Sequence, residues 1–375
     1  MIRTLLIVLA ALLLAAGFVA WGGIRFDSDF VALYAAVDGV HHGISPYDEG
    51  AQAALLTTEL GLTEPYKLDA FGYPPWYVLL ALPIGWLPYA EAGRAFLLCN
   101  LMFLFTGCYW ATTTLPPRQR LFAGMAIGFY LPLLGLLAVG QYTMPVFAGI
   151  GLGLLAVKRR SPWFLAAAAL LLSFKWHIGA LPGLALVVLV VRDRELLRRA
   201  VLPTLAVFAL ACLAGFVLDA RWPLHYVESV GRLASADVIR YCETCSSLAW
   251  TASTHFLDGG QTWIVSVLML VIGAVAMVAR KLYRDHEAWL AASIALTLIA
   301  LPYVRNYDVA LLALPIVLCM HRVSSVQARV LVASCWLIPM ALPLLHRGVA
   351  DELLGGTAAM IFAVLLVHGP ESRES

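Results

Sequence analysis

Charged residues are scarce in this sequence. Asp, Glu, Lys and Arg make up 13% of its 375 residues, whereas 62% are hydrophobic and the mean hydropathy is +0.85. A soluble domain carries about a quarter charged residues, so a soluble globular protein is excluded. The chain also lacks nucleic-acid-binding motifs and basic stripes, and its net charge is only +2. We therefore expect no nucleic acid partner.

Cysteine is sparse as well, with seven residues in the chain. Five lie in apolar segments, where cysteine is usually a small core residue; they are Cys99, Cys108, Cys212, Cys319 and Cys335. The other two, Cys242 and Cys245, form a C-x-x-C in a polar stretch. No second pair is present to complete a four-cysteine zinc site. The spacing leaves a chance occurrence, a local disulfide and half of a metal site as open alternatives.

What the chain has in abundance is apolar stretches of 17 or more residues, each about long enough to cross a bilayer. They recur from end to end and predict an all-α polytopic membrane protein, with residues 1–375 forming one domain. The first stretch, TLLIVLAALLLAAGFVAWGGI, follows Arg3. It is longer than the apolar region of a cleaved signal peptide, so we expect a retained signal-anchor helix.

Basic residues occur in short clusters between the apolar stretches, and the positive-inside rule places such clusters on the cytoplasmic side. The clusters are Arg118/Arg120, Lys158–Arg160, Arg192–Arg199, Arg280–Arg284 and Arg322/Arg329, and Arg3 precedes the first stretch. Residues 25–73 instead hold eight acidic and two basic residues. This segment is therefore expected to face outward.

An odd number of crossings must then separate residue 73 from Arg118. The stretch 94–115 is long enough to cross. The stretch 73–88 is short and carries four prolines, which interrupt helical hydrogen bonding. We expect 73–88 to lie along or dip into the outer surface without crossing.

The other stretches alternate consistently and predict about twelve spans, with both termini inside. The expected spans are 4–24, 94–115, 121–138, 143–157, 162–174, 177–191, 200–218, 261–279, 287–303, 308–320, 329–345 and 352–368. Long outer loops are expected at 25–93 and 219–260, whereas the inner loops are short and basic. This asymmetry predicts that the working face is extracytoplasmic.

The stretch DSDFVALYAAVDGVHHGISPYD, residues 27–48, gathers acidic residues directly after the first span. Apolar residues at 30, 33, 34 and 37 have the spacing of one helix face, which predicts a short amphipathic helix on the membrane. Asp29 at its start is interpreted either as an N-cap or as a catalytic base, with Asp27 as the rival base. Asp38 and Asp48 are expected to be solvated or turn residues. The adjacent His41 and His42 are interpreted either as a solvated surface pair or as ligands or bases.

Two cations are expected on the same outer side. Lys175 lies between two short spans, and Arg305 lies in LPYVRNYD. Each is interpreted either as a side chain that snorkels to the interface or as a counter-charge for a lipid phosphate, which arginine can bind bidentately. The accompanying candidates for substrate binding are Tyr34, Tyr73, Gln141, His177, Tyr307 and Asp308. Tyrosines at such positions are also typical interfacial anchors.

Acids and cations on one side of a helical bundle suit the transfer of a sugar from a lipid-phosphate donor. A carboxylate can take the proton of the acceptor hydroxyl, and Lys or Arg can stabilise the departing phosphate. One carboxylate is enough for a single inverting displacement. A glycosidase that works by double displacement needs two paired carboxylates, and no such pair is evident.

The succession DSDFVALYAAVDGVHHGISPYD, FGYPPWYVLLALPIGWLP, VGQYTMP, LLLSFKWHIGALP and LPYVRNYDVALLALP resembles glycosyltransferase family 87. The resemblance implies a GT-C fold with juxtamembrane helices in the first outer loop, and no obligatory metal or other cofactor. It implies a polyprenyl-phosphate-linked donor, such as one carrying mannose, and a lipid or glycan acceptor among the membrane lipids of a bacterial inner or plasma membrane.

The family's base falls on Asp29, and its Gly-Gln element falls on Gly140 and Gln141. The family's lysine, often followed by proline, falls on Lys175, which here precedes Trp176. Two other functions stay open at this point: a transporter or flippase of a lipid-linked sugar, which needs the cations but no base, and a non-catalytic membrane subunit.

Overall fold

The computed structural model describes residues 29–59, 68, 70–113, 115–233, 242, 245–257, 261–341 and 347–368. The expected span 4–24 and Asp27 lie outside these residues. Within them the chain is helical, and its one β pairing is an isolated bridge between Cys245 and Arg305. The prediction of an all-α chain is confirmed.

The helices follow one another closely along the chain. The first half contains α2 (Asp29–His41), α3 (Glu49–Glu59), α4 (Pro75–Ala81), the 3-10 helix η1 (Leu82–Trp86), α5 (Tyr89–Ala111), α6 (Pro117–Gly128), α7 (Leu131–Ala138), α8 (Thr143–Arg159), α9 (Pro162–Ser173) and α10 (Trp176–Arg192). The second half contains α11 (Arg194–Leu218), α12 (Trp222–Leu233), α14 (Leu248–Phe256), α15 (Thr262–Ala279), η2 (Leu282–Arg284), α16 (His286–Ala300), η3 (Asn306–Leu312), α17 (Ala313–Met320), α18 (Val326–Ala341) and α19 (Arg347–Val367).

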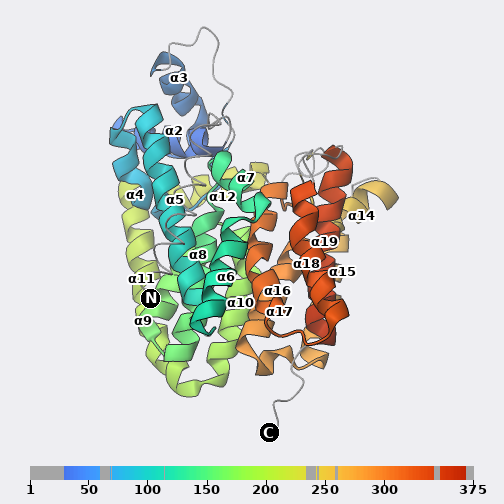
Figure 1. Ribbon diagram of the computed structural model, residues 1–375. Coiled ribbons are helices and arrows are strands. Elements are labelled where there is room, and N and C mark those ends of the chain that lie inside the picture. The colour runs from blue at the N-terminus through green and yellow to red at the C-terminus, as the bar shows by residue number, and fades with distance from the viewer. Residues whose placement is uncertain are drawn as a thin grey trace.

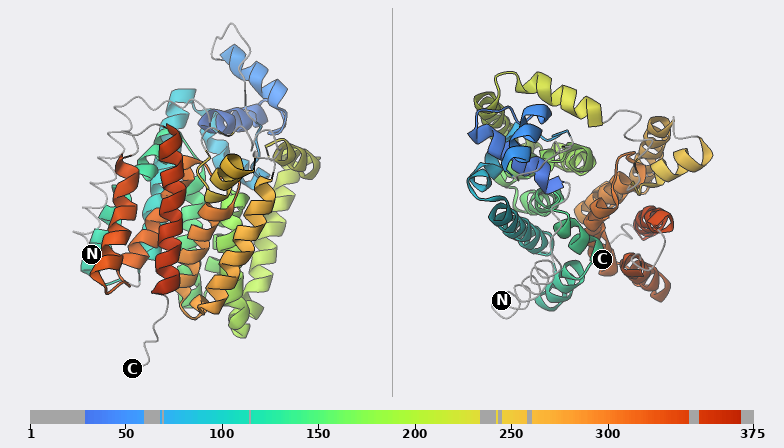
Figure 2. Two further views of the ribbon diagram at one scale, coloured as in Figure 1. Left: turned by 90° about the vertical axis from the view of Figure 1, so that its right-hand side faces the viewer. Right: turned by 90° about the horizontal axis from the view of Figure 1, so that it is seen from above.

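Most of these helices run side by side as a bundle (Figure 1). At its centre α8 packs against α5 and α9, and α16 packs against α10 and α19. Helix α8 can pack this closely because Gly151 lies against the backbone of Gly107 in α5. The short helices α2, α3, α12 and α14 gather at one end of the bundle (Figures 1 and 2). That end carries the polar residues that the sequence singled out.

Length decides which helices can cross a membrane. Three of the described helices, α5, α11 and α15, are long and apolar enough, and α6 with α7 would make a fourth if they form one bent span. Several other predicted spans are shorter apolar helices; the 12 residues of α9 rise only about 18 Å, against a hydrocarbon core of about 30 Å. The apolar helices indicate a membrane protein, but the count of about twelve spans is not confirmed.

One predicted span is two helices. The stretch 121–138 is divided into α6 and α7, which meet at a bend of 53°. Pro132 occupies the first turn of α7, where its missing N–H costs no helical hydrogen bond. Proline here starts a new helix. The stretch 73–88 forms the short α4 and η1, and the side of the membrane on which it lies stays a prediction.

Helix α2 differs from the amphipathic surface helix that its spacing predicted. Every residue from Phe30 to Gly39 is buried, so no face is left for solvent or lipid headgroups. Its ring contacts come from later segments, since Phe30 and Tyr34 pack against Tyr89, and Phe30 packs against Phe96. A helix that is buried all round packs as a core helix. The expectation of an amphipathic helix with one open face is therefore wrong, and the position of α2 at the membrane surface stays a prediction.

Candidate active site

Four segments meet at the end of the bundle that carries α2. They are the start of α2, the turn before α8, the break between α9 and α10, and residues 301–308, which lead into η3 and include its first turn. The turn before α8 depends on Gly140, whose φ of 69° lies in the left-handed region that glycine adopts without a Cβ clash. This turn directs Gln141, whose side chain is fully buried, into the site. In the Gly-Gln element, Gly140 thus allows the backbone turn, and Gln141 supplies the buried amide that follows it.

Lys175 lies at the break between α9 and α10. The chain leaves helical geometry at this residue, with φ −128° and ψ 75°, and resumes it at Trp176. Glycine at position 179 lets the two helices pack tightly here, since a Cβ would lie 2.0 Å from the carbonyl oxygen of Leu172 and clash with it. The break frees Lys175 from the helix surface and lets its side chain enter the protein, where it is 3% exposed.

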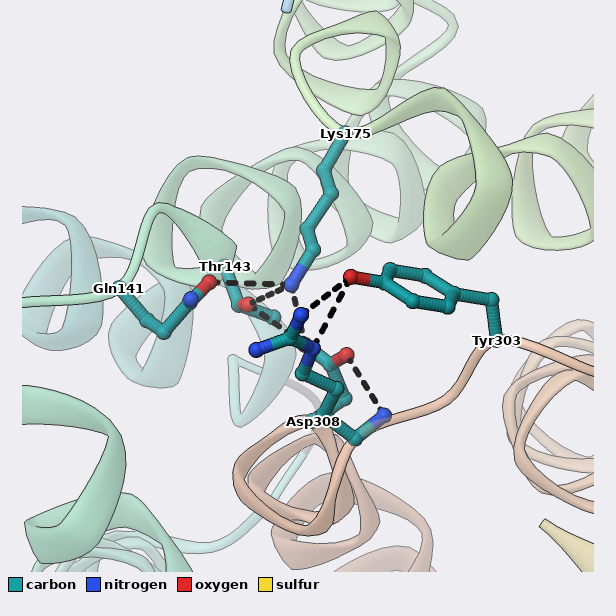
Figure 3. A network of polar contacts seen from close by, with 6 residues as sticks. Gln141, Thr143, Lys175, Tyr303 and Asp308 are labelled. Carbon is teal, nitrogen blue, oxygen red and sulfur yellow. Dashed lines mark hydrogen bonds and ion pairs between the residues drawn. The ribbon is translucent and has the colours of Figure 1, made fainter. Parts of the chain in front are cut away.

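The ammonium of Lys175 is fully hydrogen-bonded (Figure 3). Its Nζ donates to Oδ1 of Asp308 at 2.6 Å, to Oε1 of Gln141 at 3.1 Å and to Oγ1 of Thr143 at 3.1 Å. A lysine ammonium has three N–H donors, so all three are used. Thr143 also donates to Asp308 at 2.8 Å. Burying a charge is costly unless it is paired and hydrogen-bonded. Here every donor of the Lys175 ammonium has an acceptor, and the Asp308 carboxylate accepts from both Lys175 and Thr143.

Arg305 reaches the same region with fewer partners. Its Nε and Nη2 donate to the hydroxyl of Tyr303 at 3.0 and 2.5 Å, and its backbone N–H donates to Oδ2 of Asp308 at 3.3 Å. The described residues give its guanidinium no carboxylate within ion-pair distance. Unlike Lys175, Arg305 thus keeps donors for a further anion.

The segment with Arg305 is held in place by Cys245 and Ser246, which lie in the expected outer loop 219–260. Cys245 pairs with Arg305 in the β bridge, and the backbone N–H of Ser246 donates to the carbonyl oxygen of Val304 at 2.8 Å. Cys242 and Cys245 form a disulfide. Of the three alternatives that the C-x-x-C spacing left open, the structure has the local disulfide.

Asp29 stands at the first turn of α2, beside these groups. Burial, and to a smaller extent the charge of Asp308, raises the pKa of its carboxyl above the ordinary value, while the charge of Arg305, the neighbouring amide of Gln141 and the charge of Lys175 act in the opposite direction. The structure therefore brings Asp29 together with four of the residues that the sequence selected. A carboxylate with a raised pKa is a stronger base than a solvated one.

The other predicted residues divide into two groups. Tyr73 and Tyr307 lie close enough to Asp29 for its charge to act on them, and Nζ of Lys175 lies 5.1 Å from the ring centroid of Tyr307. The ring of His177 is 5.9 Å from that of Tyr303. Tyr34 lies elsewhere, with its hydroxyl on the carbonyl oxygen of Leu87 at 3.3 Å.

Two contacts of this site were missed in the sequence. Thr143 joins Lys175 to Asp308, and Tyr303 holds the guanidinium of Arg305. The available signal was spacing, because Thr143 follows Gln141 by two residues in VGQYTMP and opens α8. Tyr303 lies two residues before Arg305 in LPYVRNYD, and a tyrosine at such a position is also a typical interfacial anchor.

The arrangement combines a partly buried carboxylate, a cation with unused donors and a neutralised ion pair behind them. Residues 71–315, more than half of the chain, match a family described as glycosyltransferase family 87. The match includes Gln141, Lys175 and Arg305 and begins after Asp29. A search of curated proteins gives no match. The extent of the family match, on an all-helical chain with apolar helices, shows that this protein belongs to glycosyltransferase family 87.

Proposed function

We propose that this membrane glycosyltransferase moves a sugar, such as mannose, from a polyprenyl-phosphate donor to a hydroxyl of a lipid or glycan acceptor. Asp29 takes the proton of the acceptor hydroxyl. The acceptor oxygen then bonds to the anomeric carbon, and the bond from that carbon to the phosphate oxygen breaks. The electron pair leaves with the phosphate, and the anomeric configuration is inverted.

The observation that carries the proposal is the convergence of Asp29 with Arg305 around one buried centre. Charge grows on the phosphate as its bond to the sugar breaks, and a preorganised cation stabilises that charge. Arg305 is the better candidate for this contact because its donors are not all used. Lys175 stands behind it in a paired state and contributes positive charge and position.

The lipid part of the donor has a fitting place beside the same centre. An apolar cavity of about 500 Å³ opens between α9, α10 and α11, lined among others by Leu172, Trp176, Gly179, Gly183, Val187 and Leu205. Trp176 and Ser173, on either side of the α9–α10 break, both border it. Ordered apolar walls next to a cation suit a polyprenyl chain with a phosphate at its end.

By the positive-inside argument, the site faces the extracytoplasmic side of a bacterial inner or plasma membrane. A transporter of the same donor would use the cations without the carboxylate. The family match favours the transferase, since the matched family is one of glycosyltransferases.

The test is sugar transfer by purified protein in vesicles supplied with labelled polyprenyl-phosphate sugars and an extract of membrane lipids. Wild type is expected to attach the label to an acceptor with inverted configuration. Asp29→Asn should lower the turnover rate by about 10²–10⁴-fold, the usual contribution of a general base. Asp48→Asn, which alters an exposed carboxylate of the same loop, serves as the control and should keep full activity.

Normal turnover by Asp29→Asn, at normal protein levels, would remove Asp29 from the role of base. Movement of label across the bilayer without attachment to any acceptor would favour transport.

A further inference from the structure

A second polar cluster lies away from the active site, where the end of α2 meets the end of α3. It contains Asp38 of α2, His42 in the turn after α2 and Glu59 at the end of α3. One ligand atom from each of the three side chains can be chosen so that all three atoms lie within 4.8 Å of one another. Two carboxylates and an imidazole thus converge on a single point.

Helix geometry explains the Asp38–His42 half of the cluster. Residues four apart lie on the same helix face, and Nδ1 of His42 is 3.6 Å from Oδ1 of Asp38. Nδ1 is also 3.0 Å from the carbonyl oxygen of Asp38. A hydrogen bond from Nδ1 to that oxygen leaves Nε2 as the ligand, and such bonds commonly orient metal-binding histidines.

Asp38 is the second, independent observation. It is 4% exposed, and among the described residues its Oδ2 has no hydrogen-bond partner. A buried carboxylate oxygen without a partner is costly. Within the described ranges, neither Asp38 nor Glu59 forms an ion pair with lysine or arginine. The two carboxyl groups therefore lie together without a lysine or arginine between them among the described residues.

Other acidic residues of this region have partners. Glu49 of α3 pairs with Arg232 at 2.6 Å, and Asp219 pairs with Nδ1 of His225 at 2.7 Å and accepts from Ser45. The adjacent His41 is also engaged, since it stacks on Trp86 and its Nε2 lies 3.0 Å from the carbonyl oxygen of Leu82. The Asp38 cluster is thus unlike its neighbours.

We propose that Asp38, His42 and Glu59 bind one divalent transition-metal ion of the Zn²⁺ type, with water in the remaining position. One imidazole nitrogen with carboxylate oxygens is a donor set that zinc accepts. The ion would join the end of α3 to α2. Asp38 follows Asp29 by nine residues, or about 13 Å along the helix, so the ion would position the helix that carries Asp29 and take no part in the chemistry.

The test uses the full-length, tag-free protein in detergent, stripped of metal with a chelator and titrated with Zn²⁺ by calorimetry. Wild type is expected to bind one equivalent, and its thermal midpoint should rise with Zn²⁺, because a ligand of the folded state stabilises it. His42→Gln should weaken binding by at least about tenfold, the effect of losing a metal-site contact. The side chain of His42 is 51% exposed, so this variant is expected to fold normally.

Asp38→Asn should lose both the binding and the thermal shift. The matched control is His225→Gln, which alters an imidazole–carboxylate pair that has no third ligand among the described residues, and it should bind Zn²⁺ like wild type. Equal Zn²⁺ affinity in wild type and His42→Gln would overturn the proposal, as would the absence of binding in wild type. Tighter binding of Ca²⁺ than of Zn²⁺, unchanged in His42→Gln, would also contradict it, since imidazole is a poor ligand for Ca²⁺.

Discussion

Lys175 and Arg305 are two cations of one site, but the protein treats them differently. Lys175 is 3% exposed and uses all three ammonium donors on Asp308, Gln141 and Thr143. The guanidinium of Arg305 donates to a single phenol, that of Tyr303, among the described residues. In the proposed mechanism the two positive charges thus serve two purposes. Lys175 is fixed inside the protein and supports the site, and Arg305 is presented to the substrate.

The carboxylates show the same division. Asp308 is 1% exposed and accepts from Lys175, Thr143 and the backbone of Arg305. Asp29 is less buried and is surrounded by charges of both signs. In the proposed mechanism Asp308 contributes structure, whereas Asp29, whose pKa is raised by burial, reacts. Substitutions should therefore separate loss of stability from loss of chemistry.

The largest expected effect is that of Lys175→Met on stability. It leaves Asp308 as an unpaired buried charge, which costs about 3–5 kcal/mol. We expect a markedly lower thermal midpoint in detergent. The double variant Lys175→Met/Asp308→Leu removes both charges and should recover most of the loss.

Arg94→Met is the control, since the side chains of the Arg94–Glu91 pair are 77% and 50% exposed and such pairs contribute about 0–1 kcal/mol. A wild-type midpoint in Lys175→Met would show that Lys175 is no more structural than Arg305.

The second-largest expected effect is that of Arg305 variants on turnover and on its dependence on pH. Arg305→Ala should lower turnover by about 10²–10³-fold, as for loss of one preorganised donor, with little change in thermal midpoint. Activity requires ionised Asp29 and falls as pH drops through its pKa. Because Arg305 opposes the rise in the Asp29 pKa, its removal should move the acid limb of kcat/KM to higher pH.

Arg305→Lys keeps the charge but loses the planar fork. It should lose turnover yet keep the acid limb near its wild-type position. Identical acid limbs in wild type and Arg305→Ala would mean that Asp29 is not the group that titrates.

The smallest effect tests the apolar side of the α9–α10 break. A Cβ on Gly183 meets only Cδ1 of Leu172, at 3.8 Å, so Gly183→Leu would fill the cavity without a backbone clash. We expect the KM for a long-chain donor to rise several-fold, at about 0.8 kcal/mol per lost CH₂ contact, while a short-chain donor is unaffected. Gly356→Leu on α19, where nothing lies within 4 Å, is the control. Equal KM changes for both donors would place the chain elsewhere.

The sequence could predict which residues gather in the site, because each of them is energetically costly to place in a membrane protein. Charged and amide side chains at the ends of apolar segments are expensive, so Lys175, Arg305, Asp308 and Gln141 stood out. Most predicted helical segments from 94 onward correspond to observed helices, since apolar length and proline positions are local properties. The outcome for Lys175 could not be predicted, because its partners come from two segments far from it in the sequence, residues 141–143 and Asp308.

The failures have one physical cause. Helix α2 was predicted to have a single buried face, yet residues outside that face, Val31, Ala32, Ala35 and Ala36, are buried as well. Periodicity describes one helix and carries no information about what a distant segment will cover. Thr143 was missed for the same reason, since a threonine at a helix start gains its importance only from Asp308, far along the chain.

The Cys242–Cys245 disulfide has a consequence for how the site is completed. Disulfides persist in oxidising compartments and are rare in the cytosol. Cys245 pairs with the backbone of Arg305, so the segment that carries the arginine is held by a bond that persists in an oxidising compartment. The chemistry of sulfur therefore gives an argument for the proposed outward orientation of the site that is independent of the distribution of positive charge, and it would make assembly of the site depend on export of that segment.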